Sequence, residues 1–441
     1  MKQAERNTIV VKFGGTSLAS AEQIKKVAAI INANPDRRFV VASAPGKRNN
    51  ADIKVTDLLY QCYDAAVVGA DYELVLEQIK ARFDDIIREL NVKFDLDKEI
   101  DIIRQHLKNG PQRDYMASRG EYLNSKILAT YLGFTFIDTS QLVRFSATGV
   151  FDDAQTDIAL RAALAGVEYA VLPGFYGADD KGVIHTFSRG GSDVTGSLVA
   201  AATDASLYEN WTDVSGMLFT DPRIVNNPRT IEYVTYRELR ELSYMGASVL
   251  HEDAVFPVRK VGIPINIRNT NRPEDKGTMI VPKLPAGVPM RHVTGIAGRK
   301  GFTSILVEKS MMNNAVGFGA KMLQIFANQG LSFEHCPTGI DTMSVIVGSD
   351  SFREVKDMLL QQIRQELEPE FISVESGLAV IAVVGHGLVS AKGSAASMFR
   401  SLAESNINIR MIDQGSSEMN VIIGVDEADY ENAIRALYRI F

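Results

Sequence analysis

The stretch "TIVVKFGGTS", from Thr8 to Ser17, joins an apolar strand directly to two glycines and two hydroxyl side chains. Gly14 and Gly15 allow the backbone to turn tightly and to come close to a ligand. The helix that we expect to begin near Ser20 offers free N–H groups and the positive end of its dipole. Because Lys12 adds a positive charge, this stretch suits an anion such as a phosphate.

A second stretch, "SRGGSDVTG", repeats this arrangement later in the chain. It places Gly190 and Gly191 before a helix of small residues, with Ser192 and Asp193 at the helix start. Each stretch alone is a weak signal: neither matches the Walker A or dinucleotide-binding patterns, and Ser or Asp also serve as ordinary helix caps. Two such turns, each entering a helix, favour two anion sites that face each other. Arg189 adds a planar group suited to a carboxylate.

A third stretch, "WTDVSGMLFTDPR", ends a predicted strand at Thr212 and Asp213 and leads through a glycine-bearing loop to Arg223. The simpler interpretation is a loop with a proline turn. The functional interpretation is a nucleotide pocket with Arg223 near the phosphates.

The composition excludes several classes of protein. The chain has 441 residues, a net charge of -7 and 46% hydrophobic residues, which argues against nucleic acid or a membrane as the main partner. Its two cysteines cannot form a disulfide framework or a Cys-rich metal site, and its six histidines show no ligand spacing, so we predict no protein-built metal site. We expect a cytoplasmic protein with no membrane-spanning segment.

The first part of the chain alternates predicted strands and helices, which is typical of an α/β fold with a mostly parallel sheet. Residues 71–109 show helical spacing among charged residues and predict a helical hairpin with a solvated face. Residues 276–291 are rich in proline and glycine, and we interpret them as the boundary of the catalytic unit.

The last part of the chain contains an internal repeat with an offset of 76 residues. This offset aligns "AKMLQIFANQGLSFEH", from Ala320, with "ASMFRSLAESNINIRM", from Ala396, without a gap. It also pairs Gly317 with Gly393. Each copy is predicted to contain strand, loop, helix, strand, turn and strand, and the two copies are expected to pack against each other.

These motifs together resemble the aspartate kinase family of the amino-acid-kinase fold. The stretches "VVKFGGTSLA", "SRGEYLNSKIL", "FSRGGSDVTG", "WTDVSGMLFTDPRIV" and "MGASVLHEDAVFP" occur in the family's order and spacing. The resemblance implies a carbamate-kinase-like three-layer sandwich at 1–285. It also implies two ferredoxin-like ACT domains at 295–370 and 371–441. A monofunctional enzyme is expected, without a homoserine dehydrogenase.

The activity implied by the resemblance is ATP-dependent phosphorylation of the β-carboxylate of L-aspartate, with Mg²⁺ bridging the phosphates. This would be the first step toward lysine, threonine and methionine. The implied catalytic residues are Lys12 and Asp193. The implied ATP-binding residues are Gly14, Gly15, Thr16, Ser17, Thr212, Asp213 and Arg223. The implied substrate-binding residues are Ser43, Glu121, Arg189, Gly190, Gly191 and Ser192, with Arg189 on a carboxylate and Glu121 on the ammonium of aspartate.

The sequence departs from the family pattern at two positions. Ser248 replaces a lysine expected to reach the nucleotide phosphates, and Leu218 replaces a common tyrosine in the nucleotide loop. His251 is expected to cap or pack a helix, and Trp211 to lie in the core or a pocket wall. The cations that could replace the missing lysine are Lys47, Arg48, Arg259 and Lys260.

Two other functions remain open at this point. Arg189 and Glu121 would bind glutamate as well as aspartate, so the chain could be another amino-acid carboxylate kinase. It could also be a weakly catalytic amino-acid sensor, an alternative that rests on the departure at Ser248.

The ACT repeats imply feedback control by an amino acid and a homodimer or higher oligomer built through these repeats. The loop before Ala320 presents backbone N–H groups at a helix start, which suits an effector carboxylate. Glu334 and Asp341, expected on the following strand and turn, could take an ammonium, whereas the second copy has Arg410 and Ser417 there. We therefore favour lysine over threonine as the effector. The expected effector residues are Asn313, Asn314, Gly317, Phe318, Gly319, Glu334 and Asp341.

Overall fold

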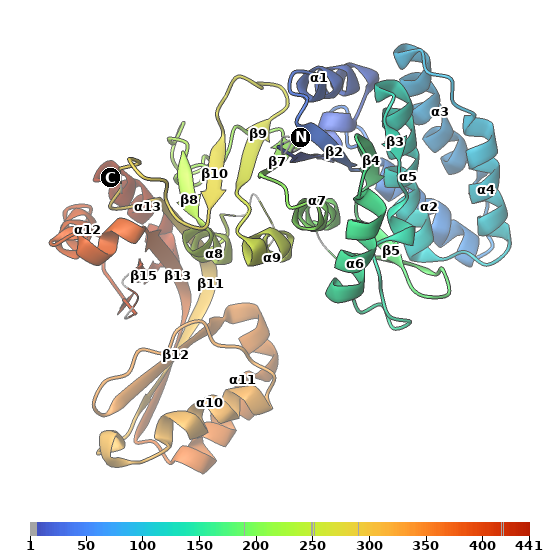
Figure 1. The fold of residues 1–441 in the computed structure, drawn as a ribbon. Helices are drawn as coiled ribbons and strands as arrows, with labels where there is room; N and C mark the ends of the chain where they lie inside the picture. Colours follow the sequence, from blue (N-terminus) through green and yellow to red (C-terminus); the bar gives the residue numbers. More distant parts are fainter. Residues whose placement is uncertain are drawn as a thin grey trace. The chain divides into compact units, whose positions relative to one another are not determined.

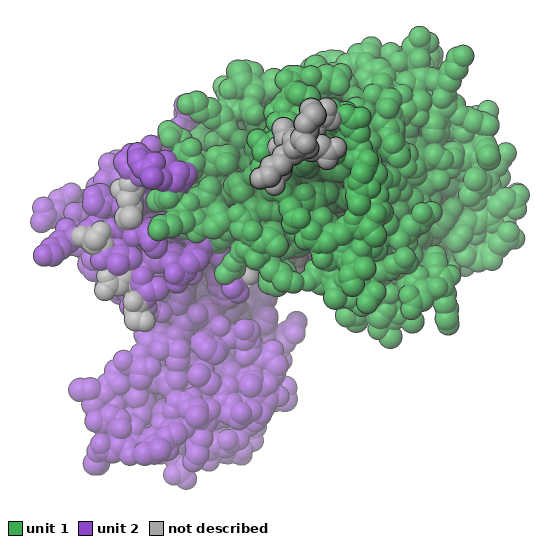
Figure 2. Space-filling model, in the orientation of Figure 1, with its two compact units in different colours: residues 1–217, 230–236, 249–284 green, residues 218–229, 237–248, 285–441 purple. Residues whose placement is uncertain are grey.

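The computed structural model describes residues 7–441 except 189, 248, 249, 251, 290, 416 and 418. Contacts divide the chain into two compact units (Figure 2). Unit 1 comprises residues 1–217, 230–236 and 249–284. Unit 2 comprises residues 218–229, 237–248 and 285–441. Two segments that precede residue 285 therefore pack with the C-terminal part of the chain.

Unit 1 is built on an eight-stranded sheet with the order β3-β4-β2-β1-β7-β9-β10-β8. Neighbouring strands are parallel except β9 and β10, which confirms the mostly parallel sheet. A separate hairpin is formed by β5 (Tyr176–Ala178) and β6 (Ile184–Thr186). The sheet strands are β1 (Ile9–Phe13), β2 (Arg37–Ala42), β3 (Thr135–Phe136), β4 (Ala170–Pro173), β7 (Leu207–Thr212), β8 (Tyr233–Thr235), β9 (Ile265–Asn269) and β10 (Thr278–Val281). The segment interpreted as a boundary thus begins with a strand, β10.

Helices cover both faces of this sheet (Figure 1). One face packs against a core that includes Phe13, Val40 and Trp211 and the apolar sides of α1 to α5. The opposite face contacts α7, which itself packs against α6 and α9. The helices are α1 (Ala21–Asn32), α2 (Val55–Val67), α3 (Glu73–Leu90), α4 (Leu96–Lys108), α5 (Arg113–Leu132), α6 (Asp153–Leu164), α7 (Gly191–Ala202) and α9 (Glu252–Val261).

The helix ends follow local sequence signals. Ser20 caps α1, since its Oγ accepts a hydrogen bond from Gln23 N at 3.4 Å. The predicted hairpin is confirmed as α3 and α4, with α3 ending at Asn91 in the left-handed conformation (φ 54°). Asp95 caps α4 through Lys98 N at 3.1 Å.

Unit 2 contains one five-stranded antiparallel sheet with the order β12-β11-β13-β15-β14. The two longest strands, β11 and β13, pair along their full lengths, and each is the first strand of one repeat. Helix α8 (Tyr236–Tyr244) begins in unit 1 and continues into unit 2. The other elements are β11 (Gly295–Glu308), α10 (Phe318–Asn328), β12 (Thr342–Gly348), α11 (Ser349–Leu367), β13 (Phe371–Val384), α12 (Ser394–Glu404), β14 (Met411–Asp413), β15 (Asn420–Asp426) and α13 (Tyr430–Arg439).

The predicted repeat is confirmed in outline, with one difference. In the second copy β14 lies between α12 and β15, but the first copy has no regular strand between α10 and β12. Only isolated bridges, from His335 to Ile346 and from Thr338 to Met343, lie there. Glu334 therefore does not lie on a strand as predicted. Among the described residues, no helix is long and apolar enough to cross a bilayer.

Helix α7 approaches the sheet closely because it carries Gly196. A Cβ at this position would lie 2.5 Å from the Tyr208 hydroxyl oxygen and 2.8 Å from its ring. Tyr208 is fully buried on β7, and its hydroxyl donates to Asp193 O at 3.2 Å. Gly196 thus sets the spacing between α7 and the strand beneath it.

Replacing Gly196 with alanine should destabilise unit 1 by about 1–3 kcal/mol, because the added methyl group has no space. Trp211, the one tryptophan of the chain, is buried in this unit, so its fluorescence during denaturant unfolding reports the change. Gly348→Ala is the matched control, since nothing lies within 4 Å of that position and its φ is negative. Equal stabilities for the two variants would contradict the close contact.

Candidate active site

A pocket of 320 Å³ lies in unit 1 where β1, β2 and β4 end and α7 begins. Carboxyl ends of parallel strands are the usual place for ligands in such sheets. Both predicted Gly-Gly turns contribute to this one pocket. Its lining residues are Lys12, Gly14, Gly15, Ser43, Thr56, Glu121, Phe175, Ser188, Gly190, Gly191, Ser192 and Asp193.

The positive charge of the pocket is held in place by a carboxylate. Lys12 Nζ lies 2.5 Å from Asp193 Oδ1, and this oxygen also accepts from Asn210 Nδ2 at 2.7 Å. Lys12 and Asn210 are direct partners across β1 and β7, while Asp193 lies in the first turn of α7. An ammonium group is thus fixed beside a helix N-terminus, and both attract anions.

Glu121 provides a buried carboxyl group from α5. Its side chain is buried, and Oε2 has no hydrogen-bond partner among the described residues. Burial raises the pKa of Glu121 to about 8, although a backbone hydrogen bond from Ala44 acts in the other direction. A buried carboxylate without a partner, facing a pocket, is suited to receive an ammonium group.

The turn after β2 is held against the first Gly-Gly turn. Gly46 N donates to Gly15 O at 2.8 Å, and a Cβ on Gly46 would lie 2.6 Å from the carbonyl carbon of Gly15. Asn124 Nδ2 donates to Ser43 O at 2.7 Å. Ser43 is therefore positioned by backbone contacts and by a side chain of α5.

Three residues expected to bind the nucleotide do not line this pocket. Thr212 ends β7 next to the first turn, because Gly14 N donates to Trp211 O at 3.0 Å. Asp213 O accepts from Asn269 Nδ2 at 3.2 Å. Neither Thr212 nor Asp213 lines the pocket, and Arg223 belongs to unit 2, where it is exposed and bound to Asp221.

Two other predicted site residues, Thr16 and Ser17, also lie outside the pocket lining. Thr16 is exposed, and Ser17 is buried with its Oγ 2.8 Å from Thr270 Oγ1. Arg189 lies outside the described residues, as do Ser248 and His251. Trp211 is buried in the core, as expected.

Sequence reasoning missed three lining residues: Thr56, Phe175 and Ser188. Ser188 directly precedes Arg189 in the second motif and could have been included. Phe175 has a φ of 81°, which is rare for a bulky residue and is often found at functional sites. Thr56 follows a long loop, and no local pattern placed it near Ser43.

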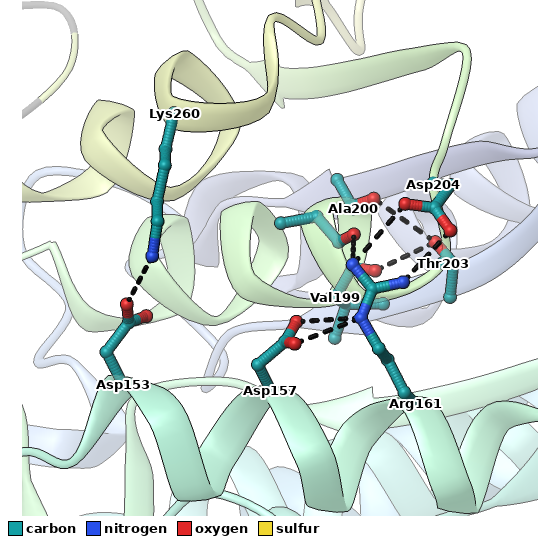
Figure 3. A network of polar contacts seen from close by, with 9 residues as sticks. Asp153, Asp157, Arg161, Val199, Ala200, Thr203, Asp204 and Lys260 are labelled. Atoms are coloured by element: carbon teal, nitrogen blue, oxygen red, sulfur yellow. Dashed lines mark hydrogen bonds and ion pairs between the residues drawn. The ribbon is translucent and has the colours of Figure 1, made fainter.

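The structure reduces the list of cations that could replace the family lysine. Arg48 is bound to Asp52 through Nε at 2.9 Å. Lys260 points toward α6, where its Nζ lies 3.2 Å from Asp153 Oδ2 (Figure 3). Lys47 and Arg259 are both exposed and remain candidates.

Comparison with known proteins agrees with this geometry. Residues 7–269 match the amino acid kinase family, and residues 381–441 match an ACT domain. The chain is 38% identical to aspartokinase 3 of Bacillus subtilis, covering 98% of both chains. The chain belongs to the aspartokinase family.

Solved structures of aspartokinases are similar over the whole chain. The aspartate kinase of Clostridium acetobutylicum is 46% identical with a TM-score of 0.89, covering 99% of this chain and 100% of that one. Aspartokinase III of Escherichia coli in complex with aspartate and ADP is 26% identical with a TM-score of 0.72, covering 98% and 99%. The same E. coli enzyme in complex with lysine and aspartate has a TM-score of 0.68 at 25% identity and the same coverage.

The residues expected to bind an effector surround the start of α10 in unit 2. Asp341 Oδ1 accepts from Met312 N at 3.3 Å, and Asp341 O accepts from Lys309 N at 2.9 Å. Asn313 and Asn314 are exposed in the same loop. Glu334 differs from expectation, because it already contacts Arg299 at 3.2 Å and the hydroxyl of Tyr244 at 2.5 Å.

If Glu121 receives the ammonium of the substrate, the KM for aspartate should depend on pH. Below a pKa of about 8 the carboxyl binds a proton, which must leave before an ammonium can pair with it. We expect KM to rise roughly tenfold or more between pH 8.5 and pH 6.5 at saturating ATP. Initial rates over an aspartate series at each pH measure this rise.

Glu121→Gln should give a high KM that no longer follows pH over this range. Glu22→Gln, an exposed position on α1, serves as the control and should keep the pH dependence of the wild type. A pH-dependent KM that survives in Glu121→Gln would assign the titration to another group.

Proposed function

We propose that this aspartokinase transfers the γ-phosphoryl group of ATP to the β-carboxylate of L-aspartate in the pocket described above. The observation that carries this proposal is that a fixed ammonium group and a buried carboxyl group line one pocket. Lys12 and the start of α7 attract phosphoryl oxygens, while Glu121 offers a carboxylate to an ammonium. An amino acid with a side-chain carboxylate can span the two.

The chemistry needs no covalent enzyme intermediate, because the substrate carboxylate itself attacks phosphorus. The protein positions the two reactants and neutralises charge on the transferring group. Lys12 supplies a positive charge fixed by Asp193, so little reorganisation is needed during transfer. Arg189, in the second Gly-Gly motif, is proposed to hold a carboxylate of aspartate through two parallel hydrogen bonds.

The E. coli relative solved with aspartate and ADP supports ATP as the phosphoryl donor. We further propose Mg²⁺ as a cofactor. The described residues contain no cluster of three His, Cys, Asp or Glu side chains suited to a metal. Mg²⁺ bound mainly by nucleotide phosphates and water needs only one or two carboxylates, and Asp193 on the pocket wall could supply one. When bound, the ion would neutralise phosphate charge.

Lys12→Ala should lower kcat much more than it changes the KM for aspartate, since the phosphoryl charge grows toward the transition state. The expected loss is about 3 kcal/mol in the activation barrier. The assay follows acyl hydroxamate formed with ATP, Mg²⁺ and hydroxylamine from aspartate, glutamate or no substrate.

Lys26→Ala, exposed on α1, is the control and should behave as wild type. A near-normal kcat for Lys12→Ala would make Lys12 structural. Wild-type protein that forms glutamyl hydroxamate instead of aspartyl hydroxamate would favour another carboxylate kinase. No hydroxamate from either substrate would favour a sensor.

We also propose that lysine inhibits the enzyme through the first ACT repeat. The loop before α10 offers backbone N–H groups at a helix N-terminus for the effector carboxylate. Asp341 adds a negative charge at the base of this loop. Exposed apolar residues of the same repeat, Met311, Val316 and Ile340, support an interface with a second copy of the chain. Inhibition then follows if lysine binds one arrangement of the dimer more tightly.

Asp341→Asn should raise the lysine concentration for half-inhibition roughly tenfold, because a charged partner of the effector ammonium is lost. Rates over a lysine series, with threonine as a comparison, measure this shift. The matched control is Asp350→Asn, which changes an exposed carboxylate of the same repeat. A flat lysine response in the wild type, or equal shifts in both variants, would refute the assigned pocket.

A further inference from the structure

Arg82 is a buried arginine that lies outside the pocket. It belongs to α3, in the hairpin that the sequence suggested to be only a solvated face, yet it is 6% exposed. Its Nη1 lies 2.7 Å from Asp52 Oδ2 and 3.3 Å from Ile53 O. Its Nη2 lies 3.0 Å from Gly46 O and 3.3 Å from Ala19 O. One guanidinium group thus binds four oxygens.

These four oxygens come from two segments that both shape the pocket. Ala19 ends the short turn that follows Gly14 and Gly15, after β1. Residues 43–54 form the loop after β2, which begins with Ser43 and leads to Thr56. The two segments already touch on the pocket side, through Gly46 N and Gly15 O. Arg82 joins them a second time, from α3.

A second arginine helps to keep the Asp52 side chain negatively charged. Arg48 binds Asp52 through its backbone N and through Nε, both at 2.9 Å, so two arginines share one carboxylate. Hydrogen bonds from Arg48, together with the nearby charge of Arg82, hold the pKa of Asp52 well below its usual range. Asp52 therefore stays ionised, and Arg82 keeps its partner at any pH where the enzyme works.

A lysine at position 82 could not replace this contact. A guanidinium group presents five donors in one plane, whereas an ammonium group is a compact point charge on a flexible stem. Loss of the guanidinium would leave the carbonyl oxygen of Gly46, a buried residue, without this donor, and an unsatisfied buried carbonyl is destabilising. The loop would then move toward water to satisfy it.

We infer that Arg82 is a positioning residue for phosphoryl transfer, because it fixes the turn that binds the phosphoryl group relative to the turn that carries Ser43. This inference rests on the proposed function. Arg82 is not among the residues that line the pocket and acts through backbone carbonyl groups. A displacement of about 1 Å between reacting groups can lower a rate roughly 100-fold, so a loss of register between the two turns should affect kcat most.

The test compares Arg82→Ala with Arg88→Ala. Arg88 lies on the same helix, its side chain is 72% exposed, and among the described residues this side chain forms an ion pair only with Asp85, three residues earlier. We expect kcat to fall ten- to 100-fold in Arg82→Ala, more than either KM changes, and to be unchanged in Arg88→Ala. Guanidinium ion at tens of millimolar should restore part of the kcat of Arg82→Ala and should not activate the wild type.

A second measurement does not depend on activity. Hydrogen exchange of residues 14–20 and 43–55 should become at least tenfold faster in Arg82→Ala and stay unchanged in Arg88→Ala. Wild-type kcat with wild-type exchange in Arg82→Ala would overturn the inference. A wild type without kinase activity would instead overturn the proposed function, while the exchange result would still decide whether Arg82 holds the two turns.

If Arg82→Ala does not fold, two milder variants take its place. Arg82→Lys keeps the charge but not the planar donors, and kcat should fall at least threefold. Asp52→Asn keeps the size of the side chain but removes its charge, and exchange of residues 43–55 should increase. Wild-type values of kcat and exchange in both variants would reject the inference.

Discussion

The ion pair between Lys12 and Asp193 is the contact on which the rest of the candidate active site depends. It joins the central strand β1 to the first turn of α7, two elements that are far apart in the sequence. Each partner lacks another described ion pair, and Lys12 is nearly inaccessible to water. Breaking such a pair by removing one partner is costly, because it leaves a charge without compensation. The position of α7 and the charge of the pocket are therefore set together.

The other walls of the pocket are held by contacts of the same kind, between a side chain on one element and the backbone of another. Asn124 binds Ser43 O, and Arg82 binds carbonyl groups of both turns. The tight fit of Gly196 against Tyr208 keeps α7 close to β7. Contacts within the protein thus hold the walls of the aspartokinase pocket, which lowers the cost of orienting the two reactants.

Much of this fold could be predicted from the sequence, because the informative residues are adjacent in the chain. The two Gly-Gly turns follow or precede regular elements directly, so short motifs were enough to predict that they lie at a common site. Thr56 and Phe175 were missed because only the folded sheet brings them to Ser43 and Gly191. Arg82 was missed for a different reason: helical spacing in a charged segment does not reveal which charge is buried. The strand expected at Glu334 failed because its neighbours form only isolated bridges.

The segment 218–229 links the two units in a way that limits how this enzyme can be divided. The segment begins a few residues after β7 ends at Thr212, yet its Phe219 and Val225 belong to the apolar core formed by β13, β15 and α13. Ile296 N donates to Phe219 O at 2.7 Å, which extends this attachment to the backbone. A catalytic fragment cut at residue 285 would expose both side chains to water. A chimera that replaces the ACT repeats should therefore replace the segment 218–229 with them. A junction at residue 285 alone would separate this segment from its apolar partners.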